Sequence, residues 1–302
     1  ADSCANTRCH PFMDAWKALH HYLRLRRNVR DAWHVLQRYR VSSDDVDVVL
    51  RNGAHLTLRR ACQDVTIFHR IFVQDEYRLE RYERRIKGDV VDLGANVGLF
   101  ACRIAGRAAR VICYEPITPN FAQLQRNTAA LSNVTNVHAA VSGTAKTIRI
   151  HYPTDANFSG GFSQYPHPHL HHTDTYEDVP AVTLEMIFSR HDIQHCSMLK
   201  IDVEGAEYDI LYQTPAAVLS CIERISGEYH HINGGDASRR IGALAAFLNK
   251  HGFDVEAMPK RRLANHGLFF AHRANRPAGG VTRYTGPGAA RHLASTGGNA
   301  AA

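Results

Sequence analysis

The residues that mark fibrous, disulfide-bonded or membrane-spanning proteins are scarce in this sequence. Of 302 residues, 7 are cysteine, 11 proline and 21 glycine, too few for a collagen-like repeat or a disulfide scaffold. No apolar run approaches the roughly 18 residues that a membrane-spanning helix needs. No basic start followed by an apolar segment indicates a secretory signal. The odd number of cysteines, set in apolar surroundings, predicts reduced thiols and a cytoplasmic protein.

Acidic residues are scarce at both ends of the chain. Of the net charge of +7, residues 1–40 carry +5 and residues 273–302 carry +4, which leaves −2 for residues 41–272. A nucleic-acid enzyme concentrates positive charge around its active face. The near-neutral middle therefore argues against a nucleic-acid substrate and favours a small molecule.

Residues 12–40 have helical spacing. Trp16, Leu19 and Leu23, followed by Val29, Trp33 and Leu36, recur at steps of three and four, which predicts a helix that lies on the body by its apolar stripe. A partner-binding arm is the alternative, and a homo-oligomer could form through it. Short alternating stretches then predict a hairpin around Asn52 and Gly53.

From residue 89 the pattern alternates between short apolar strands and helices, which predicts parallel strands joined by crossover helices. The expected fold is α/β, a Rossmann-like doubly wound sheet that is mostly parallel with an antiparallel C-terminal edge strand. The tail is poor in hydrophobic residues and predicts disorder. The expected units are residues 1–64 (a helix and short strands), 65–272 (the α/β domain) and 273–302 (the tail).

A glycine-rich turn joins the first parallel strand to its helix. Residues 90–100 read VVDLGANVGLF, and Gly94 and Gly98 would let a cofactor lie against bare backbone. The pattern lacks the G-x-G-x-x-G spacing that holds a pyrophosphate. Asp92 would repel phosphate and attract an ammonium or sulfonium group.

Glu115 ends the second parallel strand, where an acid typically accepts hydrogen bonds from both ribose hydroxyls. A nucleoside with a cationic group and no phosphate describes S-adenosylmethionine. A nicotinamide dehydrogenase is the nearest rival among enzymes, since Glu115 would suit it as well.

Carboxylates cluster after a later buried strand. Residues 199–207 read LKIDVEGAE, which puts Asp202, Glu204 and Glu207 close together. Glu228 and His230 follow the next strand, and the carboxyl ends of adjacent parallel strands meet at one crevice. Like charges this close are costly unless they face a cation or share protons, so the cluster predicts a functional site.

With these motifs in place, the sequence resembles the FkbM family of S-adenosylmethionine-dependent methyltransferases. The hallmark lies at residues 199–207 and the glycine turn at 91–98. Tyr114-Glu115-Pro116 matches the next segment, and residues 74–77 resemble the lead-in to the domain. The match covers roughly 65–232.

The resemblance implies a class I methyltransferase fold and, most often, O-methylation of a hydroxyl on a sugar or secondary metabolite. Transferred residue by residue, it implies the following cofactor contacts: Asp92, Gly94, Asn96 and Gly98 beside the methionine, Glu115 at the ribose, Ser142 near the adenine, and Asp202 at the reaction centre. Tyr77, from the lead-in segment, is a further expected cofactor contact.

Methyl transfer to a hydroxyl benefits from a base, and four residues are candidates: Asp202, Glu204, Glu228 and His230. Unperturbed, His230 titrates nearest neutrality. The alternative is a divalent metal such as Mg²⁺ at Asp202, Glu204 and Glu228.

Further hypotheses concern the His-rich segment and the activity of the chain as a whole. The His-rich segment 151–172 could be a surface loop or could bind a transition metal, and residues 157–163 before its centre could form a lid over the acceptor. The chain could also be a catalytically silent module that retains a cofactor cleft.

Overall fold

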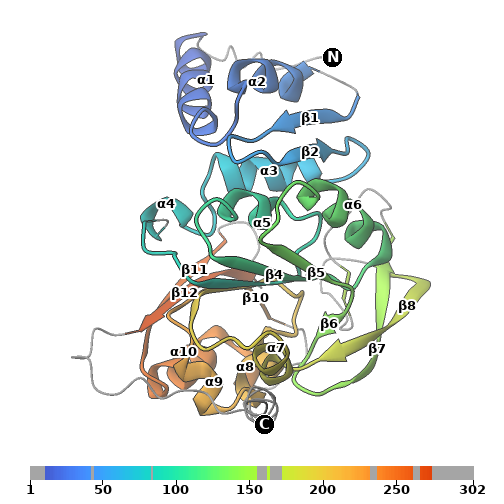
Figure 1. The fold of residues 1–302 in the computed structure, drawn as a ribbon, viewed down its shortest axis with the longest axis vertical. Helices are drawn as coiled ribbons and strands as arrows, with labels where there is room; N and C mark the ends of the chain where they lie inside the picture. The colour runs from blue at the N-terminus through green and yellow to red at the C-terminus, as the bar shows by residue number, and fades with distance from the viewer. Residues whose placement is uncertain are drawn as a thin grey trace, which may run out of the picture.

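A seven-stranded sheet forms the centre of the chain in the computed structural model (Figure 1). The structure describes residues 11–41, 44–82, 84–154, 162–163, 172–231, 237–260 and 266–273. The predictions for the centre of the His-rich segment and for residues 274–302 lie outside these ranges.

The strands of this sheet lie in the order β11-β12-β10-β9-β3-β4-β5. β5, β4, β3, β9 and β10 are mutually parallel, and β12 runs antiparallel to both of its neighbours. The predicted doubly wound sheet is thus confirmed, with one difference: antiparallel β12 lies inside the edge strand β11. The bounds are β3 Asp89–Leu93, β4 Arg110–Tyr114, β5 Val134–Val137, β9 Cys196–Ile201, β10 Arg224–His230, β11 Phe253–Pro259 and β12 His266–Arg273.

Helices cover both faces of the sheet (Figure 1). The alternation of side chains along each strand divides the core between the two faces: Val90 packs in one cluster and Val91 in the other. One face carries α3 Asp64–Phe72, α5 Leu99–Ile104 and α6 Thr118–Thr128; the other carries α7 Leu184–Arg190, α8 Glu207–Gln213, α9 Ala216–Ser220 and α10 Ile241–Lys250. The short helices are α4 Leu79–Tyr82 and the 3-10 turn Ala237–Arg239.

A second sheet of three strands flanks the main one. It comprises β6 Ala140–Val141, β7 Lys146–Pro153 and β8 His172–Val182, in the order β6-β8-β7. The sequence predicts a single strand over residues 137–141, but the structure ends β5 at Val137 and gives Ala140 and Val141 to the small sheet, where they pair with β8.

The N-terminal elements are α1 Pro11–Leu25, α2 Ala32–Val41, β1 Val46–Val49 and β2 His55–Leu58. The predicted hairpin is confirmed, since β1 and β2 pair antiparallel. The predicted helix of 12–40 is two helices, because the chain turns at Val29, which forms a bridge with Leu50.

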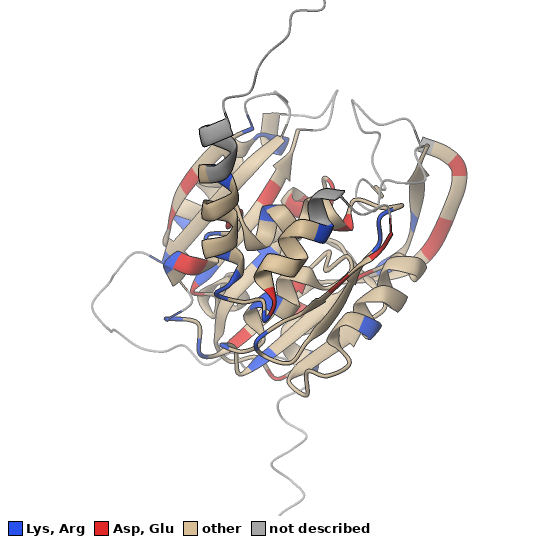
Figure 2. Ribbon diagram, turned by 90° about the horizontal axis from the view of Figure 1, so that it is seen from above, with Lys and Arg blue, Asp and Glu red and all other residues tan. Residues whose placement is uncertain are grey.

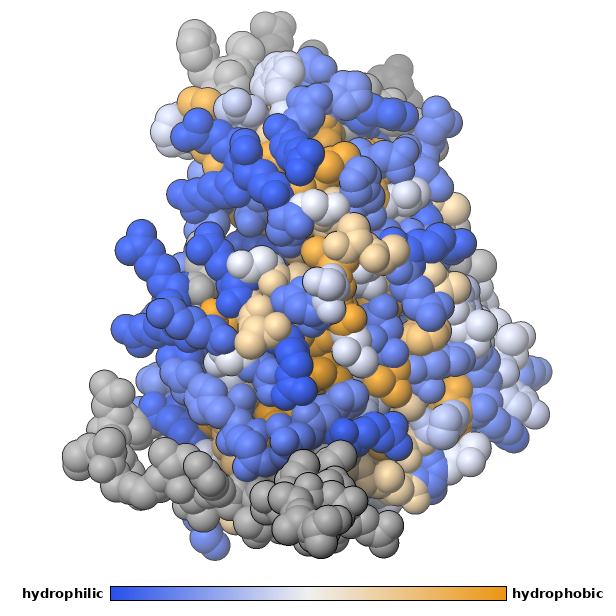
Figure 3. All heavy atoms as spheres, in the orientation of Figure 1, coloured by the Kyte–Doolittle hydropathy of each residue, from blue (hydrophilic) through white to orange (hydrophobic). Residues whose placement is uncertain are grey.

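The apolar stripe of α1 does not pack on the body as expected. Trp16, Leu19 and Leu23 are 71%, 46% and 40% exposed, whereas Leu25 and Val29 are buried. The helix therefore rests on a different face, and hydrophobic residues show among hydrophilic ones near α1 and α2 (Figure 3).

Charged residues of both signs are interspersed over the fold (Figure 2). The five described cysteines are free thiols. No helix among the described residues is both long enough and apolar enough to cross a bilayer.

Candidate active site

A cavity of about 810 Å³ opens at the carboxyl ends of the parallel strands. Its lining comes from the turn after β3, the end of β4, the residues that follow β9, and α3 with the segment after it. Ligand sites in doubly wound sheets lie at this edge, and the volume falls in the range of small-molecule sites.

The glycine turn brings β3 and β9 into close backbone contact. Gly94 has a φ of +72°, and a Cβ added there would lie 1.9 Å from the carbonyl oxygen of Asp202. The N–H groups of Gly94 and Ala95 both donate to the carbonyl of Tyr114 at 3.0 Å. Gly94 therefore links the ends of β3, β4 and β9. Because it has no side chain, its backbone is also open to the cavity.

We expect Gly94→Ala to destabilise the fold severely. The left-handed backbone alone costs a non-glycine residue about 1–2 kcal/mol, and the clash with Asp202 adds to that cost. Gly53→Ala is the matched control, because Gly53 has a φ of +94° with no atom within 4 Å of an added Cβ. Urea unfolding of both variants measures the difference; equal losses of stability would contradict the role given to Gly94.

Glu115 lies at the cavity wall with its carboxylate almost fully buried. One oxygen accepts a hydrogen bond from the N–H of Asn96 at 2.8 Å and the other from the N–H of Ile117 at 3.0 Å. Burial raises the pKa of Glu115 to about 7 despite these two bonds. Each oxygen retains a second acceptor position, so the carboxylate can accept two more donors.

Asp92 does not line the cavity as the sequence predicts. Its side chain is fully buried, and its Oδ1 forms an ion pair with the Nζ of Lys200 at 3.1 Å. The same ammonium donates to the carbonyl of Gly94 at 2.6 Å. Burial alone would lower the pKa of Lys200. The attraction of Asp92 and Asp202 outweighs this effect, so the pKa is raised overall and the lysine stays charged.

Asp202 lies in the cavity lining beside Tyr77. The hydroxyl of Tyr77 donates to its Oδ2 at 2.9 Å, and both residues line the cavity. Burial alone would raise the pKa of Asp202; the positive charges of Lys200, His230 and Arg70 lower it overall. The carboxylate is therefore ionised at neutral pH, and the lowered pKa makes it a weaker base than an ordinary aspartate.

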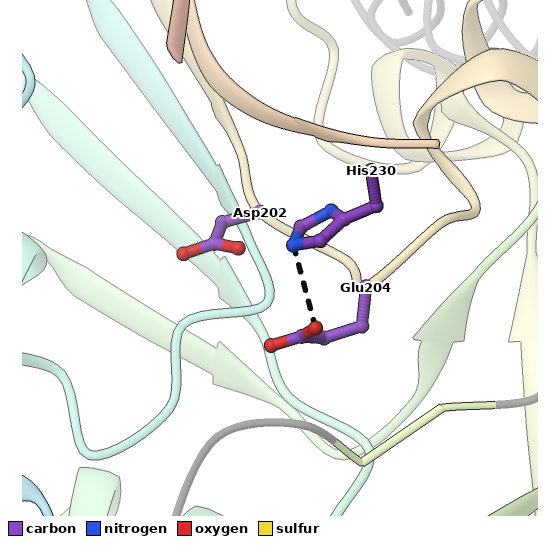
Figure 4. Close-up of side chains that lie close together, drawn as sticks. All are labelled: Asp202, Glu204 and His230. Carbon is purple, nitrogen blue, oxygen red and sulfur yellow. Dashed lines mark ion pairs between the residues drawn. The ribbon is translucent and has the colours of Figure 1, made fainter. Parts of the chain in front are cut away.

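The carboxylates of Asp202 and Glu204 lie beside the ring of His230 (Figure 4). Its Nε2 lies 3.4 Å from Glu204, and its Nδ1 lies 3.3 Å from the buried Glu207. Burial lowers the pKa of His230, but Glu204, Glu207 and Glu228 outweigh it and raise the pKa to about 10. The ring therefore holds its proton at neutral pH, unlike the unperturbed histidine that the sequence analysis considered as a base.

Asp202, Glu204 and His230 form a cluster in which one potential ligand atom from each lies within 4.8 Å of the others. Glu228 does not belong to this group of potential ligands, although its Oε1 lies 3.8 Å from the Nε2 of His230. Its carboxylate pairs with Arg70 at 2.8 Å and with Lys260 at 2.7 Å. Of the predicted metal ligands, Asp202 and Glu204 therefore lie in one group of potential ligand atoms, whereas Glu228 pairs with Arg70 and Lys260 instead.

Two other predicted cofactor contacts lie outside the cavity lining. Gly98, the N-cap of α5, has a φ of +83° and packs on α6, where an added Cβ would lie 2.6 Å from Leu124. Ser142 is buried after β6, and its N–H donates to Val182. Asn96, in contrast, lines the cavity with Gly94 and Glu115.

Sequence reasoning missed Lys200, Arg70 and Lys260, and it named Glu207 in the carboxylate cluster without its contact to His230. A signal existed for Lys200, because a lysine inside an otherwise apolar strand needs a buried partner. No local signal marks Arg70 or Lys260, which reach the cavity from elements distant in sequence.

A family model described as the methyltransferase FkbM domain matches residues 92–255, just over half of the chain. The 31-O-demethyl-FK506 methyltransferase FkbM of Streptomyces tacrolimicus is 29% identical over 248 residues, covering 71% of this chain and 92% of that protein. The AMB antimetabolite synthetase AmbE of Pseudomonas aeruginosa is 26% identical over 223 residues, covering 63% of this chain. This chain spans only 10% of the length of AmbE.

Among solved structures, methyltransferase FkbM from Methylobacillus flagellatus KT aligns with a TM-score of 0.39 at 14% identity, covering 70% of this chain and 54% of that chain. The sheet order described above and the family match agree with the class I methyltransferase fold that the motifs imply.

Proposed function

The chain belongs to the methyltransferase FkbM domain family, and on that premise we propose that it transfers a methyl group from S-adenosylmethionine to a hydroxyl of a sugar or secondary metabolite. The observation that carries the proposal is one cavity lined by both a buried acceptor, Glu115, and a paired, ionised Asp202. When bound, S-adenosylmethionine supplies a methyl group on a positively charged sulfur, whose S–C bond breaks as the new O–C bond forms.

The residues present suit this donor better than a dinucleotide. Glu115 offers two acceptor positions to ribose hydroxyls, and Gly94 and Asn96 leave backbone open beside it. The negative field at Asp202 and Glu204 favours a sulfonium and disfavours a pyrophosphate. These features weigh against the nicotinamide alternative.

At the acceptor side, Asp202 is the group that takes the hydroxyl proton. It is ionised, it lines the cavity, and Tyr77 fixes its orientation. His230 already holds a proton, so its part is to keep Glu204 and Glu207 in place. The sulfonium is a good leaving group, so the main contribution of the site is alignment of the hydroxyl with the methyl group.

Thermal shift and calorimetry with two ligands test the donor assignment. S-Adenosylhomocysteine should raise the melting temperature, because a ligand that binds only the folded state stabilises it by RT ln(1 + [L]/Kd). NAD should leave it unchanged. Stabilisation by NAD and not by S-adenosylhomocysteine would overturn the proposal in favour of an oxidoreductase.

The affinity for S-adenosylhomocysteine should increase with pH across neutrality. With a pKa of about 7, Glu115 loses one acceptor position to a proton at lower pH and regains it at higher pH. The ionised fraction rises by about tenfold between pH 6 and pH 8, and Kd should fall by a similar factor. Glu115→Gln should flatten this dependence; a pH profile identical to that of the wild type would contradict the assignment.

Two arrangements of positive charge satisfy the cluster of Asp202, Glu204 and His230. One is the proton that the raised pKa of His230 keeps on its ring; the other is a divalent cation such as Mg²⁺ held by the three residues. Exhaustive chelation distinguishes them. Unchanged turnover supports the protonated form, whereas loss of turnover that returns with added Mg²⁺ supports the metal.

A further inference from the structure

A second set of charges lines the cavity beyond Asp202. Arg70 comes from α3, and Lys260 directly follows β11. Arg70 donates through Nε to Glu76 at 2.8 Å and through Nη2 to Glu228 at 2.8 Å. The Nζ of Lys260 lies 2.7 Å from Glu228 and 3.3 Å from Glu76. Two cations and two carboxylates therefore form one ring of ion pairs.

In this ring the cationic side chains are more exposed than the carboxylates. The side chains of Arg70 and Lys260 are 30% and 26% exposed, whereas those of Glu76 and Glu228 are 8% and 7% exposed. All four residues line the cavity. Although the ring is neutral in total, its cationic side chains are more accessible than its carboxylates.

Arg70 and Lys260 also keep donors to spare. The guanidinium has five N–H groups and the ammonium three. Among the described residues, no hydrogen bond or ion pair engages the Nη1 of Arg70, and Lys260 meets two carboxylates with three donors. Donors held in place by buried carboxylates are pre-organised, which reduces the ordering cost of binding an anion.

The cavity lining thus contains cationic donors at Arg70 and Lys260 in addition to the carboxylates of Asp202 and Glu204. We propose that Arg70 and Lys260 form a subsite that binds a carboxylate or similar oxyanion of a ligand in the cavity, an inference that rests on the proposed function. The oxyanion can belong to the amino-acid end of the S-adenosyl donor or to an anionic group of the acceptor. The binding geometry is a charge-assisted hydrogen-bond pair, which suits a planar carboxylate.

The first experiment examines the donor as the source. We would titrate wild-type protein, Arg70→Gln and Lys260→Gln with S-adenosylhomocysteine and with methylthioadenosine, which lacks the amino-acid end. If the donor carboxylate occupies the subsite, each variant should bind S-adenosylhomocysteine about 10–100-fold more weakly and methylthioadenosine equally well.

The second experiment examines the acceptor as the source. With the protein saturated in S-adenosylhomocysteine, benzoate and its neutral counterpart benzamide are titrated by ligand-observed NMR. If the acceptor supplies the oxyanion, the wild type binds benzoate more tightly than benzamide, and the two variants lose that preference.

Removing one cation leaves a carboxylate of the ring less compensated, so a balanced variant is needed. The double variant Arg70→Gln with Glu76→Gln removes one charge of each sign, and it should reproduce the loss of oxyanion binding with a melting temperature near that of the wild type. Arg149→Gln is the control, because Arg149 pairs with Asp178 on the surface and does not line the cavity.

The subsite is refuted if all variants keep wild-type affinity for S-adenosylhomocysteine and the wild type shows no preference for benzoate. That outcome leaves the proposed function intact as long as S-adenosylhomocysteine binds. If neither S-adenosylhomocysteine nor methylthioadenosine binds the wild type, the proposed function itself fails.

Discussion

Asp202→Asn should lower kcat for hydroxyl methylation by about 10²–10⁴-fold, the usual contribution of a positioned base. Asparagine keeps the shape of the side chain and can still accept from Tyr77, but it cannot take the proton. Radioactive methyl transfer from the donor, with any acceptor that the wild type methylates, measures the effect. Binding of S-adenosylhomocysteine by calorimetry shows whether the cofactor site survives the substitution.

Asp209→Asn is the control for this prediction, since Asp209 lies in the same region of the chain but pairs with Arg239 near the surface. It should retain the turnover of the wild type. Near wild-type turnover in Asp202→Asn with bound donor would show that another group accepts the proton. If the wild type binds the donor but forms no product across a broad panel of hydroxyl compounds, the silent-module hypothesis gains support.

Lys200→Met should lower the free energy of unfolding by about 3–5 kcal/mol, because removing one partner of a buried ion pair leaves an uncompensated charge. The remaining charge is the carboxylate of Asp92, which is fully buried. Adding Asp92→Asn in the same chain should recover part of the loss, which would identify Asp92 as the partner. Urea unfolding of the wild type, both single variants and the double variant gives the coupling energy.

Lys250→Met serves as the control for charge removal, because Lys250 is exposed at the end of α10. Its effect should stay within about 0.5 kcal/mol. If Lys200→Met were equally mild, the buried pair of Lys200 and Asp92 would not stabilise the fold as expected.

The parallel strands, the glycine turn and the acids at the strand ends could be predicted because each leaves a local pattern. Glu115 and Asp202 follow apolar strands directly, and both line the cavity. The direction of Asp92 could not be predicted, since it depends on Lys200 of the neighbouring strand β9, which pairs in register with it. The direction of the Asp92 side chain thus depends on a residue that is far from it in sequence.

The protonation of His230 was out of reach for the same reason. Glu228 is close to His230 in sequence. Glu207, at the start of α8, is far from His230 in sequence, but its carboxylate contacts the Nδ1 of that histidine. The packing of α1 was also missed: helical periodicity identifies an apolar stripe without telling whether the body or solvent meets it, and Trp16 is the most exposed residue of that stripe.

A crystal structure with S-adenosylhomocysteine is the most direct test of the account. It should place the ribose hydroxyls on the Glu115 carboxylate and the sulfur on the side of the cavity where Asp202 and Tyr77 meet. A ligand bound elsewhere, or one whose ribose leaves Glu115 without contact, would contradict the central claim that this cavity binds the methyl donor.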